Sequence, residues 1–155
     1  AMTGWRIGWL LAPENVSKKI GSLQSQETSN PCSVSQYAAL AALRGDQSCV
    51  EAMKVEFEKR RNYVTERIAA IPGMTAPPMG GAFYAFMNIQ NFLGRDYNGV
   101  RVETDRDWCL ALLEQQKVAT VFGSAFFADG YARASFAASM ETLEIAFDRI
   151  EAFVK

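Results

Sequence analysis

The chain has 155 residues, of which 49% are hydrophobic and 21% are charged, a composition typical of a soluble globular protein with a core of its own. Its 16 Lys and Arg against 17 Asp and Glu give a net charge of −1, so no basic surface for nucleic acid or an anionic membrane is expected. Histidine is absent. This excludes Ser-His and Cys-His nucleophile pairs within the chain and removes the commonest metal ligand.

Membrane and metal partners are not expected either. No apolar run approaches the roughly 20 residues that a membrane helix needs, and the start shows no signal-peptide pattern. The three cysteines, Cys32, Cys49 and Cys109, are odd in number and widely spaced. This pattern disfavours a disulfide framework or a zinc site and favours buried or partly buried free thiols in a reducing compartment, so we expect a cytoplasmic protein without a metal.

The first third of the chain is predicted to contain a strand and two helices. Residues 5–11 are apolar and aromatic apart from one arginine, which predicts a buried strand that ends before Pro13. Helices are predicted over residues 14–22 and 33–43, the second ending near Gly45. Ser29-Asn30-Pro31 forms the turn between them, because a residue before proline is disfavoured in helical geometry.

A long amphipathic helix is predicted over residues 51–70 and ends at Pro72-Gly73. Its apolar positions follow the spacing of three and four residues that places side chains on one helix face. These positions are Val50, Met53, Phe57, Val64, Ile68 and Ile71.

The remainder alternates strands and helices. Strands are predicted over residues 82–89, 118–122 and 131–137, with loops over 94–99 and 123–130. Thr104 caps a helix through Gln116, with Asp107 in the third position, and Ser139 caps a last helix. The apolar face of that last helix comprises Leu143, Ala146, Phe147, Ile150 and Val154. This βαββα order predicts an α/β or α+β layer.

Two arginines are candidates for ligand binding. Arg6 lies in the apolar segment 5–11, and a buried arginine needs a partner such as a phosphate, whose oxygens match the guanidinium fork. Arg133 lies in the predicted strand 131–137. The alternatives are a surface or ion-paired arginine at position 6 and a half-exposed strand arginine at position 133.

The first residues, Ala-Met-Thr-Gly-Trp-Arg-Ile-Gly over positions 1–8, resemble a segment of the fold-type I aminotransferases, the aspartate aminotransferase-like family that depends on pyridoxal phosphate. The resemblance implies that Arg6 binds the cofactor phosphate. In that family a Ser-x-Lys stretch directly precedes this segment, so the Schiff-base lysine is expected just upstream of Ala1, and no catalytic residue is expected in the chain. Arg133, in Arg-Ala-Ser-Phe-Ala, resembles the family arginine that binds the substrate α-carboxylate.

Further family motifs follow in order. Ser29-Asn30-Pro31 resembles a segment at the subunit interface near the neighbouring active site, which makes Asn30 a candidate, although a turn before a helix explains it equally well. Residues 80–84, Gly-Gly-Ala-Phe-Tyr, resemble a strand start that we interpret as structural, with glycines for a tight turn and aromatic side chains in the core; an acid-base role for Tyr84 is a minor alternative. Where the family has Pro-Gly-x-x-Phe-Gly, Phe122 replaces the proline and Phe127 the last glycine, which puts the loop shape in question while Gly123 keeps the turn.

The resemblance implies the C-terminal part of the pyridoxal-phosphate-dependent transferase fold. Residues 1–60 would be the end of the large cofactor-binding domain, including part of the long helix, and residues 61–155 the small α/β domain. The expected parent is a homodimeric aminotransferase acting on aspartate or a related amino acid and a 2-oxo acid, and the fragment alone is expected to be inactive. Two alternatives stay open: a non-catalytic aminotransferase-like regulator domain and a pyridoxal-phosphate lyase of the same fold.

Overall fold

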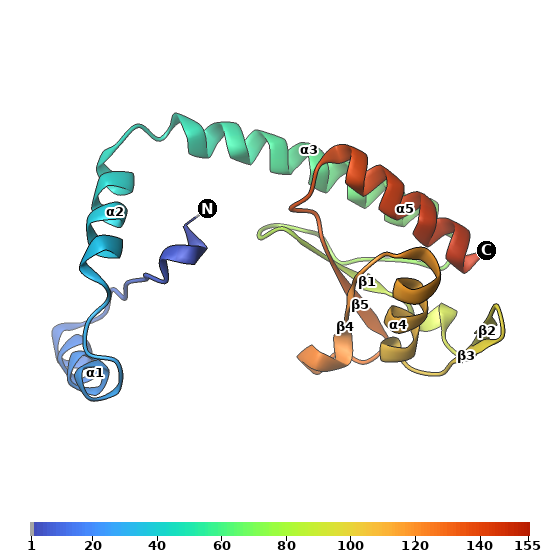
Figure 1. The fold of residues 1–155 in the computed structure, drawn as a ribbon, viewed down its shortest axis with the longest axis horizontal. Helices are drawn as coiled ribbons and strands as arrows, with labels where there is room; N and C mark the ends of the chain where they lie inside the picture. The colour runs from blue at the N-terminus through green and yellow to red at the C-terminus, as the bar shows by residue number, and fades with distance from the viewer. Residues whose placement is uncertain (1) are drawn as a thin grey trace. The chain divides into compact units, whose positions relative to one another are not determined.

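The computed structural model describes residues 2–155 and divides the chain into two compact units, Ala1–Glu51 and Ala52–Lys155 (Figure 1). In the first unit, a short 3-10 helix, η1 (Thr3–Trp5), precedes α1 (Glu14–Glu27) and α2 (Ser33–Arg44). Both predicted helices are confirmed, and α1 is five residues longer than predicted. The α2 helix ends where Gly45 donates its N–H to the carbonyl of Ala41.

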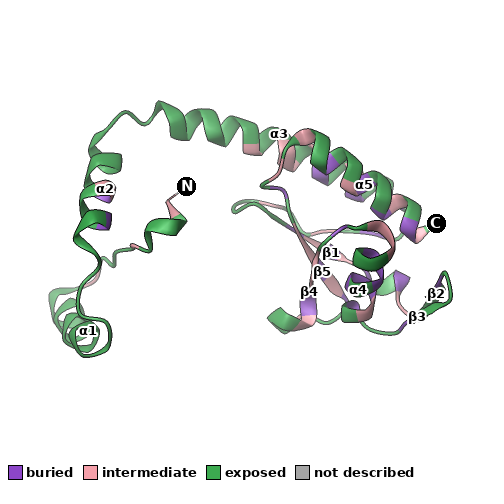
Figure 2. Ribbon diagram, viewed as in Figure 1, coloured by how far each residue is buried: buried purple, intermediate pink, exposed green. Residues whose placement is uncertain are grey.

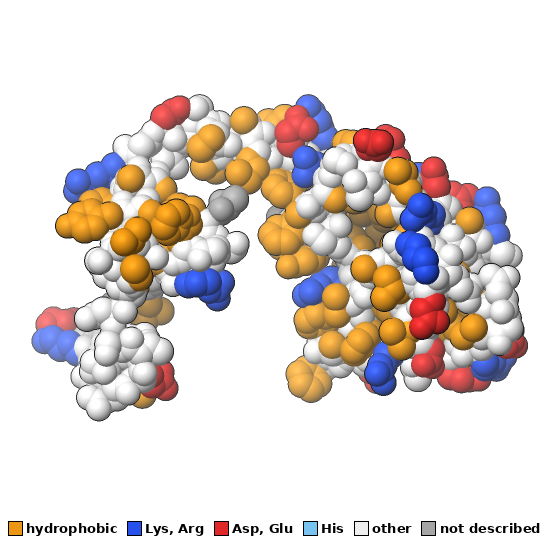
Figure 3. All heavy atoms as spheres, in the orientation of Figure 1, with side chains coloured by type: hydrophobic (Ala, Val, Ile, Leu, Met, Phe, Trp, Pro, Cys, Tyr) orange, Lys and Arg blue, Asp and Glu red, His pale blue; other side chains and the backbone are white. Residues whose placement is uncertain are grey.

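The predicted strand over residues 5–11 is wrong. After η1 the chain runs without regular structure to Pro13, and Trp9 and Leu11 are 68% and 92% exposed. A strand needs a neighbour to accept its backbone hydrogen bonds, and no strand occurs among residues 2–51. Figure 3 shows hydrophobic side chains on the surface over α2, and Figure 2 shows how little of this unit is buried. Only Ser35 and Ala39 are buried within residues 2–51.

The long helix α3 (Ser48–Ala70) crosses the boundary between the units and confirms the predicted helix. Its predicted apolar face is only half buried. Val50 and Met53 are 51% and 39% exposed, whereas Val64 and Ile68 are almost fully buried. The difference arises because the core of the second unit contacts α3 only from Phe57 onward.

The second unit is an α+β layer, which confirms the predicted βαββα order. An antiparallel sheet has the strand order β1-β5-β4, formed by β1 (Tyr84–Asn88), β4 (Val121–Phe122) and β5 (Tyr131–Ser135). Helices α4 (Asp105–Gln116) and α5 (Met140–Val154) share one hydrophobic core with α3 and the sheet. Ala85, Met87 and Ala132 carry the core face of the sheet and are fully buried.

The predicted loop over residues 94–99 is a β-hairpin of β2 (Arg95–Tyr97) and β3 (Val100–Val102). Asn98 and Gly99 both have positive φ, 50° and 84°, as a tight hairpin turn requires. The short helices η2 (Gln90–Phe92) and η3 (Gly123–Phe126) complete the unit. The η3 helix occupies part of the predicted loop over residues 123–130.

Both predicted caps are confirmed. Thr104 and Asp107 form a reciprocal capping box at the start of α4, and the Ser139 side chain accepts a hydrogen bond from the N–H of Thr142 at the start of α5. The α5 face is buried as predicted at Leu143, Phe147 and Ile150, and Phe153 joins it.

Candidate functional site: an arginine between two aromatic rings

Arg133 lies in the central strand of the sheet, on the face opposite the core. Side chains alternate along a strand, so Arg133 points away from the buried side chain of Ala132. Its partners across the sheet are Phe86 on β1 and Val121 on β4. The structure therefore places Arg133 on the side of the sheet that the core leaves free.

Two aromatic rings flank the guanidinium of Arg133. Its Cζ lies 4.4 Å from the ring centroid of Tyr84 and 4.3 Å from that of Phe126, both within cation–π distance. The ring contacts restrain the guanidinium, yet among residues 2–155 the Arg133 side chain has no ion pair or hydrogen bond. Its N–H donors are therefore available to an anion that approaches between the rings.

Tyr84 was expected in the core, and this expectation is wrong. Tyr84 and Phe83 are 36% and 38% exposed. Ala85 and Met87 take the core face of β1, so alternation places the Tyr84 side chain beside Arg133 instead. Phe86 stacks on Tyr131 with ring centroids 5.0 Å apart, which extends the aromatic surface around the arginine.

In the loop that carries Phe126, the backbone at positions 122 and 127 adopts conformations that suit the family's proline and glycine, although both positions are phenylalanine. Phe122 has φ −65° and ψ 141°, a conformation that proline also adopts, and Phe127 has φ 58° and ψ 33°, the left-handed region that glycine favours. Gly123 keeps the turn, as predicted, because of close packing. A Cβ on Gly123 would lie 2.2 Å from the carbonyl oxygen of Ala128, so no side chain fits there.

Arg6 and Asn30 both lie in the first unit and are exposed. Arg6 adopts a left-handed backbone conformation with φ 51°, and its Nη1 donates to the carbonyl of Thr3 at 3.0 Å. No ion pair to Arg6 occurs in the described part of the chain. Asn30 lies in the turn between α1 and α2, and no hydrogen bond within residues 2–155 joins its side chain to Arg6.

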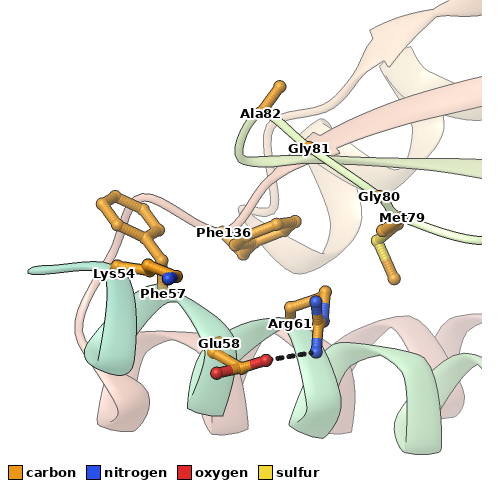
Figure 4. Close-up of a pocket in the computed structure, with 9 residues that line it drawn as sticks. All are labelled: Lys54, Phe57, Glu58, Arg61, Met79, Gly80, Gly81, Ala82 and Phe136. Atoms are coloured by element: carbon orange, nitrogen blue, oxygen red, sulfur yellow. Dashed lines mark hydrogen bonds and ion pairs between the residues drawn. The ribbon is translucent and has the colours of Figure 1, made fainter. Parts of the chain in front are cut away.

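A separate cavity of about 200 Å³ lies between α3 and the segment before β1 (Figure 4). Arg61 and Glu58 form an ion pair of 3.1 Å on its α3 side. We expected the glycines at positions 80 and 81 to be needed for a tight turn, and the structure does not support this. A Cβ on Gly80 or Gly81 would meet nothing within 4 Å. The residue with positive φ is Ala82, at 57°.

The expectation that the thiols are buried is correct only for Cys109. Burial raises the pKa of Cys109 to about 11, and the Thr120 hydroxyl donates to its Sγ at 3.2 Å, so this thiol is unreactive near neutral pH. Cys32 and Cys49 are exposed, and all three cysteines are free. In residues 2–155, no group of three or more metal-binding side chains is placed to hold an ion, and no helix is both long and apolar enough to cross a membrane.

Residues 1–150 match the protein family described as Aminotransferase class I and II. The chain belongs to this aminotransferase family. The family resemblance of residues 1–8 and 133–137 is thereby confirmed, together with the fold class that it implied.

Several relatives show how far the likeness extends. The chain is 41% identical to the aspartate/prephenate aminotransferase of Cereibacter sphaeroides over 98% of its length, and 43% identical to the aspartate aminotransferase of Geobacillus stearothermophilus over its whole length. It also resembles the crystal structure of the Rhizobium meliloti aspartate aminotransferase, with a TM-score of 0.90 and 40% identity over 99% of the chain. The chain spans 38% of the length of each of these relatives.

Sequence reasoning found Arg133 and missed the residues that hold it in place. Phe126 was part of the loop motif, but nothing in the sequence places its ring against an arginine seven positions later. Asp105, a buried carboxylate at the start of α4, was not considered at all. The available signal was an extra acidic residue inside a first turn that Thr104 and Asp107 already cap.

Proposed function

We propose that the protein to which this chain belongs is a pyridoxal-phosphate-dependent aminotransferase that transfers the amino group of aspartate or a related amino acid to a 2-oxo acid. The observation that carries this proposal is the Arg133 guanidinium, restrained by Tyr84 and Phe126 and open to an anion, in a chain of the aminotransferase family. The names of the relatives support it. In addition, the Thermus thermophilus aspartate aminotransferase, which is 33% identical with a TM-score of 0.86 over 99% of this chain and 38% of its own, was solved with maleate, a dicarboxylate.

In this proposal, Arg133 binds the α-carboxylate of the substrate through two parallel N–H bonds and orients the amino group. Arg6 binds the phosphate of the cofactor. The Arg6 side chain fits that role because it is exposed and, within the described residues, its hydrogen bond to the carbonyl of Thr3 leaves other N–H donors for a ligand. Pyridoxal phosphate, when bound, supplies the electron sink that amino-acid chemistry at Cα requires.

The arrangement of the whole enzyme is part of the same proposal. Residues 1–60 belong to the cofactor-binding domain and residues 61–155 to the small domain, in a cytoplasmic homodimer with Asn30 near the subunit interface. The identities of about 40% with named aspartate aminotransferases support this arrangement.

Replacing Arg133 with lysine in the complete enzyme tests the proposal. Arg133→Lys keeps the charge but loses the two-pronged geometry, so kcat/KM for amino acids should fall roughly 30- to 1,000-fold, or about 2–4 kcal/mol. Amines that lack the carboxylate should react as before, and the melting temperature should barely change.

A matched control is Arg95→Lys, because Arg95 is also a strand arginine above an aromatic ring, 5.5 Å from the centroid of Phe92. This control should leave the kinetics unchanged. A structural role for Arg133 predicts the reverse pattern, with a lower melting temperature and unchanged kcat/KM, and that result would refute the proposal.

A further inference from the structure

Asp105 is a buried carboxylate without a cationic partner in the described part of the chain. It is the first residue of α4 and only 4% exposed. A buried carboxylate is costly unless hydrogen bonds compensate for the lost water. Asp105 accepts three of them: its Oδ2 from the N–H of Ser124 at 2.7 Å, and its Oδ1 from the Ser124 hydroxyl at 3.0 Å and the Arg106 N–H at 2.9 Å.

Two of these three donors belong to Ser124, so the carboxylate fastens η3 to the start of α4. Its place at the helix N-terminus adds favourable interaction with the exposed N–H dipoles of the first turn. Gly123 fixes η3 from another side, because its Cα lies so close to Ala128 and Tyr131 that a Cβ would overlap both. The loop is thus held by a polar contact at Ser124 and by close packing at Gly123.

Phe126 ends η3, two residues after Ser124, and its ring centroid lies 4.3 Å from the guanidinium carbon of Arg133. Phe126 is 42% exposed, and outside the core its ring meets the Phe86 ring edge-to-face, with centroids 6.4 Å apart. Its position depends on this contact and on the backbone of η3, which Asp105 holds at Ser124 and close packing holds at Gly123. Releasing Ser124 would free one of the two rings that restrain the arginine.

We propose that Asp105 is a positioning residue for the carboxylate site, acting through Ser124 and Phe126 on Arg133. The inference rests on the proposed function and deepens it, because it names the contact that keeps the Arg133 guanidinium preorganised for an α-carboxylate. Preorganisation of this kind improves binding by reducing the ordering that the ligand must impose.

The test measures carboxylate binding without turnover. Maleate has no amino group and cannot be transaminated, so its Kd for the complete enzyme, measured by calorimetry, reports carboxylate binding separately from catalysis. Asp105→Asn should weaken maleate binding about 3- to 30-fold, which lies within the range of coupling between neighbouring residues. Ser124→Ala, which removes only the hydroxyl bond, should weaken it less. It also provides a milder variant if Asp105→Asn does not fold.

Thr104→Ala is the matched control. It removes the cap of the same helix, and Thr104 makes no hydrogen bond to η3. A general loss of α4 stability would weaken maleate binding in Thr104→Ala and Asp105→Asn alike, at equal loss of melting temperature, and that result would overturn the inference. The inference predicts that, of these three variants, Asp105→Asn and Ser124→Ala change the Kd and Thr104→Ala does not.

A double variant tests the route of the effect. Phe126→Leu removes the ring from Arg133 and leaves the Asp105–Ser124 contacts in place. If Asp105 acts through that ring, adding Asp105→Asn to Phe126→Leu should weaken maleate binding no further. Fully additive losses would show that Asp105 acts by another route and overturn the inference.

The outcomes also separate this inference from the proposed function. If the unmodified enzyme neither transaminates nor binds maleate, or if Arg133→Lys leaves the Kd unchanged, both proposals fail. If Arg133→Lys weakens maleate binding and Asp105→Asn behaves like Thr104→Ala, the carboxylate site stands and only the positioning role of Asp105 is refuted.

Discussion

At the scale of single residues, the partners of an arginine decide what it can do. Arg67 is a structural arginine: it pairs with Asp148 at 2.7 Å, also donates to the hydroxyl of Tyr63, and thereby joins α3 to α5. Its pKa is raised despite the opposing effect of burial, because the hydrogen bonds to Asp148 and Tyr63 favour the charged form. Within the described chain, the Arg133 guanidinium contacts aromatic rings and has no carboxylate or hydroxyl partner. Its charge and N–H donors are therefore available to bind a ligand.

Phe127 gives a direct prediction about backbone strain. It adopts a left-handed conformation with φ 58°, and its side chain is fully exposed, so it contributes no packing. A non-glycine residue in this region costs about 1–2 kcal/mol, while a glycine loses about 0.5–1 kcal/mol more conformational entropy on folding. Phe127→Gly should therefore stabilise the protein by about 0.5–1 kcal/mol and raise the melting temperature by about 1–4 °C.

Phe127→Ala separates strain from the loss of the aromatic ring. It removes the same exposed ring but keeps a Cβ in the left-handed conformation, so it should not raise the melting temperature. Equal stabilisation by alanine and glycine would contradict the strain argument and show that the ring itself is unfavourable.

At the scale of elements, the features predicted correctly are those formed by residues close to each other in the sequence. The capping box of α4 was predictable because Thr104 and Asp107 are three positions apart and contact each other. The β2–β3 hairpin was missed although Asn98-Gly99 is the strongest short signal for a hairpin turn, because the flanking strands are only three residues each. The strand predicted over residues 5–11 failed because its apolar pattern gives no information on whether a neighbouring strand exists.

The same capping box predicts a pH dependence. Hydrogen bonds from the side chain and then the N–H of Thr104 lower the pKa of Asp107. A lowered pKa in the folded state means that the carboxylate stabilises the fold above its unfolded pKa of about 3.9 and loses this effect as the pH falls through the folded value. Asp107→Asn should therefore lower the melting temperature at pH 7, and the gap to the unmodified protein should narrow below about pH 4.

The Thr104→Ala background shows whether the cap is responsible. Without the Thr104 hydroxyl, the largest cause of the lowered pKa is gone, so the Asp107→Asn gap at pH 7 should shrink. A gap that is the same at pH 7 and pH 3 would show that Asp107 acts through packing or shape and not through its charge.

At the scale of the whole molecule, the two units differ in how much they bury. Residues 52–155 contain almost all of the buried hydrophobic side chains, including Trp108, Phe136 and Ile150 at no more than 2% exposure. Within residues 2–51, Ala39 is the only buried hydrophobic side chain. Conformational entropy opposes folding in both units alike, so burial can stabilise only the second as an independent unit.

This difference also explains how much of the candidate site was predictable. Arg133 could be found because its motif is short and local. Tyr84 on β1 and Phe126 on η3 contact Arg133, and Asp105 on α4 contacts Ser124, through the tertiary packing of the second unit. No spacing in the sequence encodes those distances. Arg6 and Asn30 lie exposed in the first unit, where few side chains are buried. The structure there gives few contacts that bear on the roles indicated by their motifs.

Limited proteolysis of the isolated 155-residue chain tests the difference between the units. The backbone of residues 2–51 should open and be cleaved first, because local stability follows burial. Cleavage should stop within the first half of α3, ahead of Phe57, where contacts with the core begin. Mass spectrometry should therefore find a resistant product that starts between residues 48 and 57 and ends at Lys155, and this product should unfold cooperatively on heating. Resistance of residues 2–51 at protease levels that cleave an unfolded chain would contradict the argument, as would early cuts in α4 or α5.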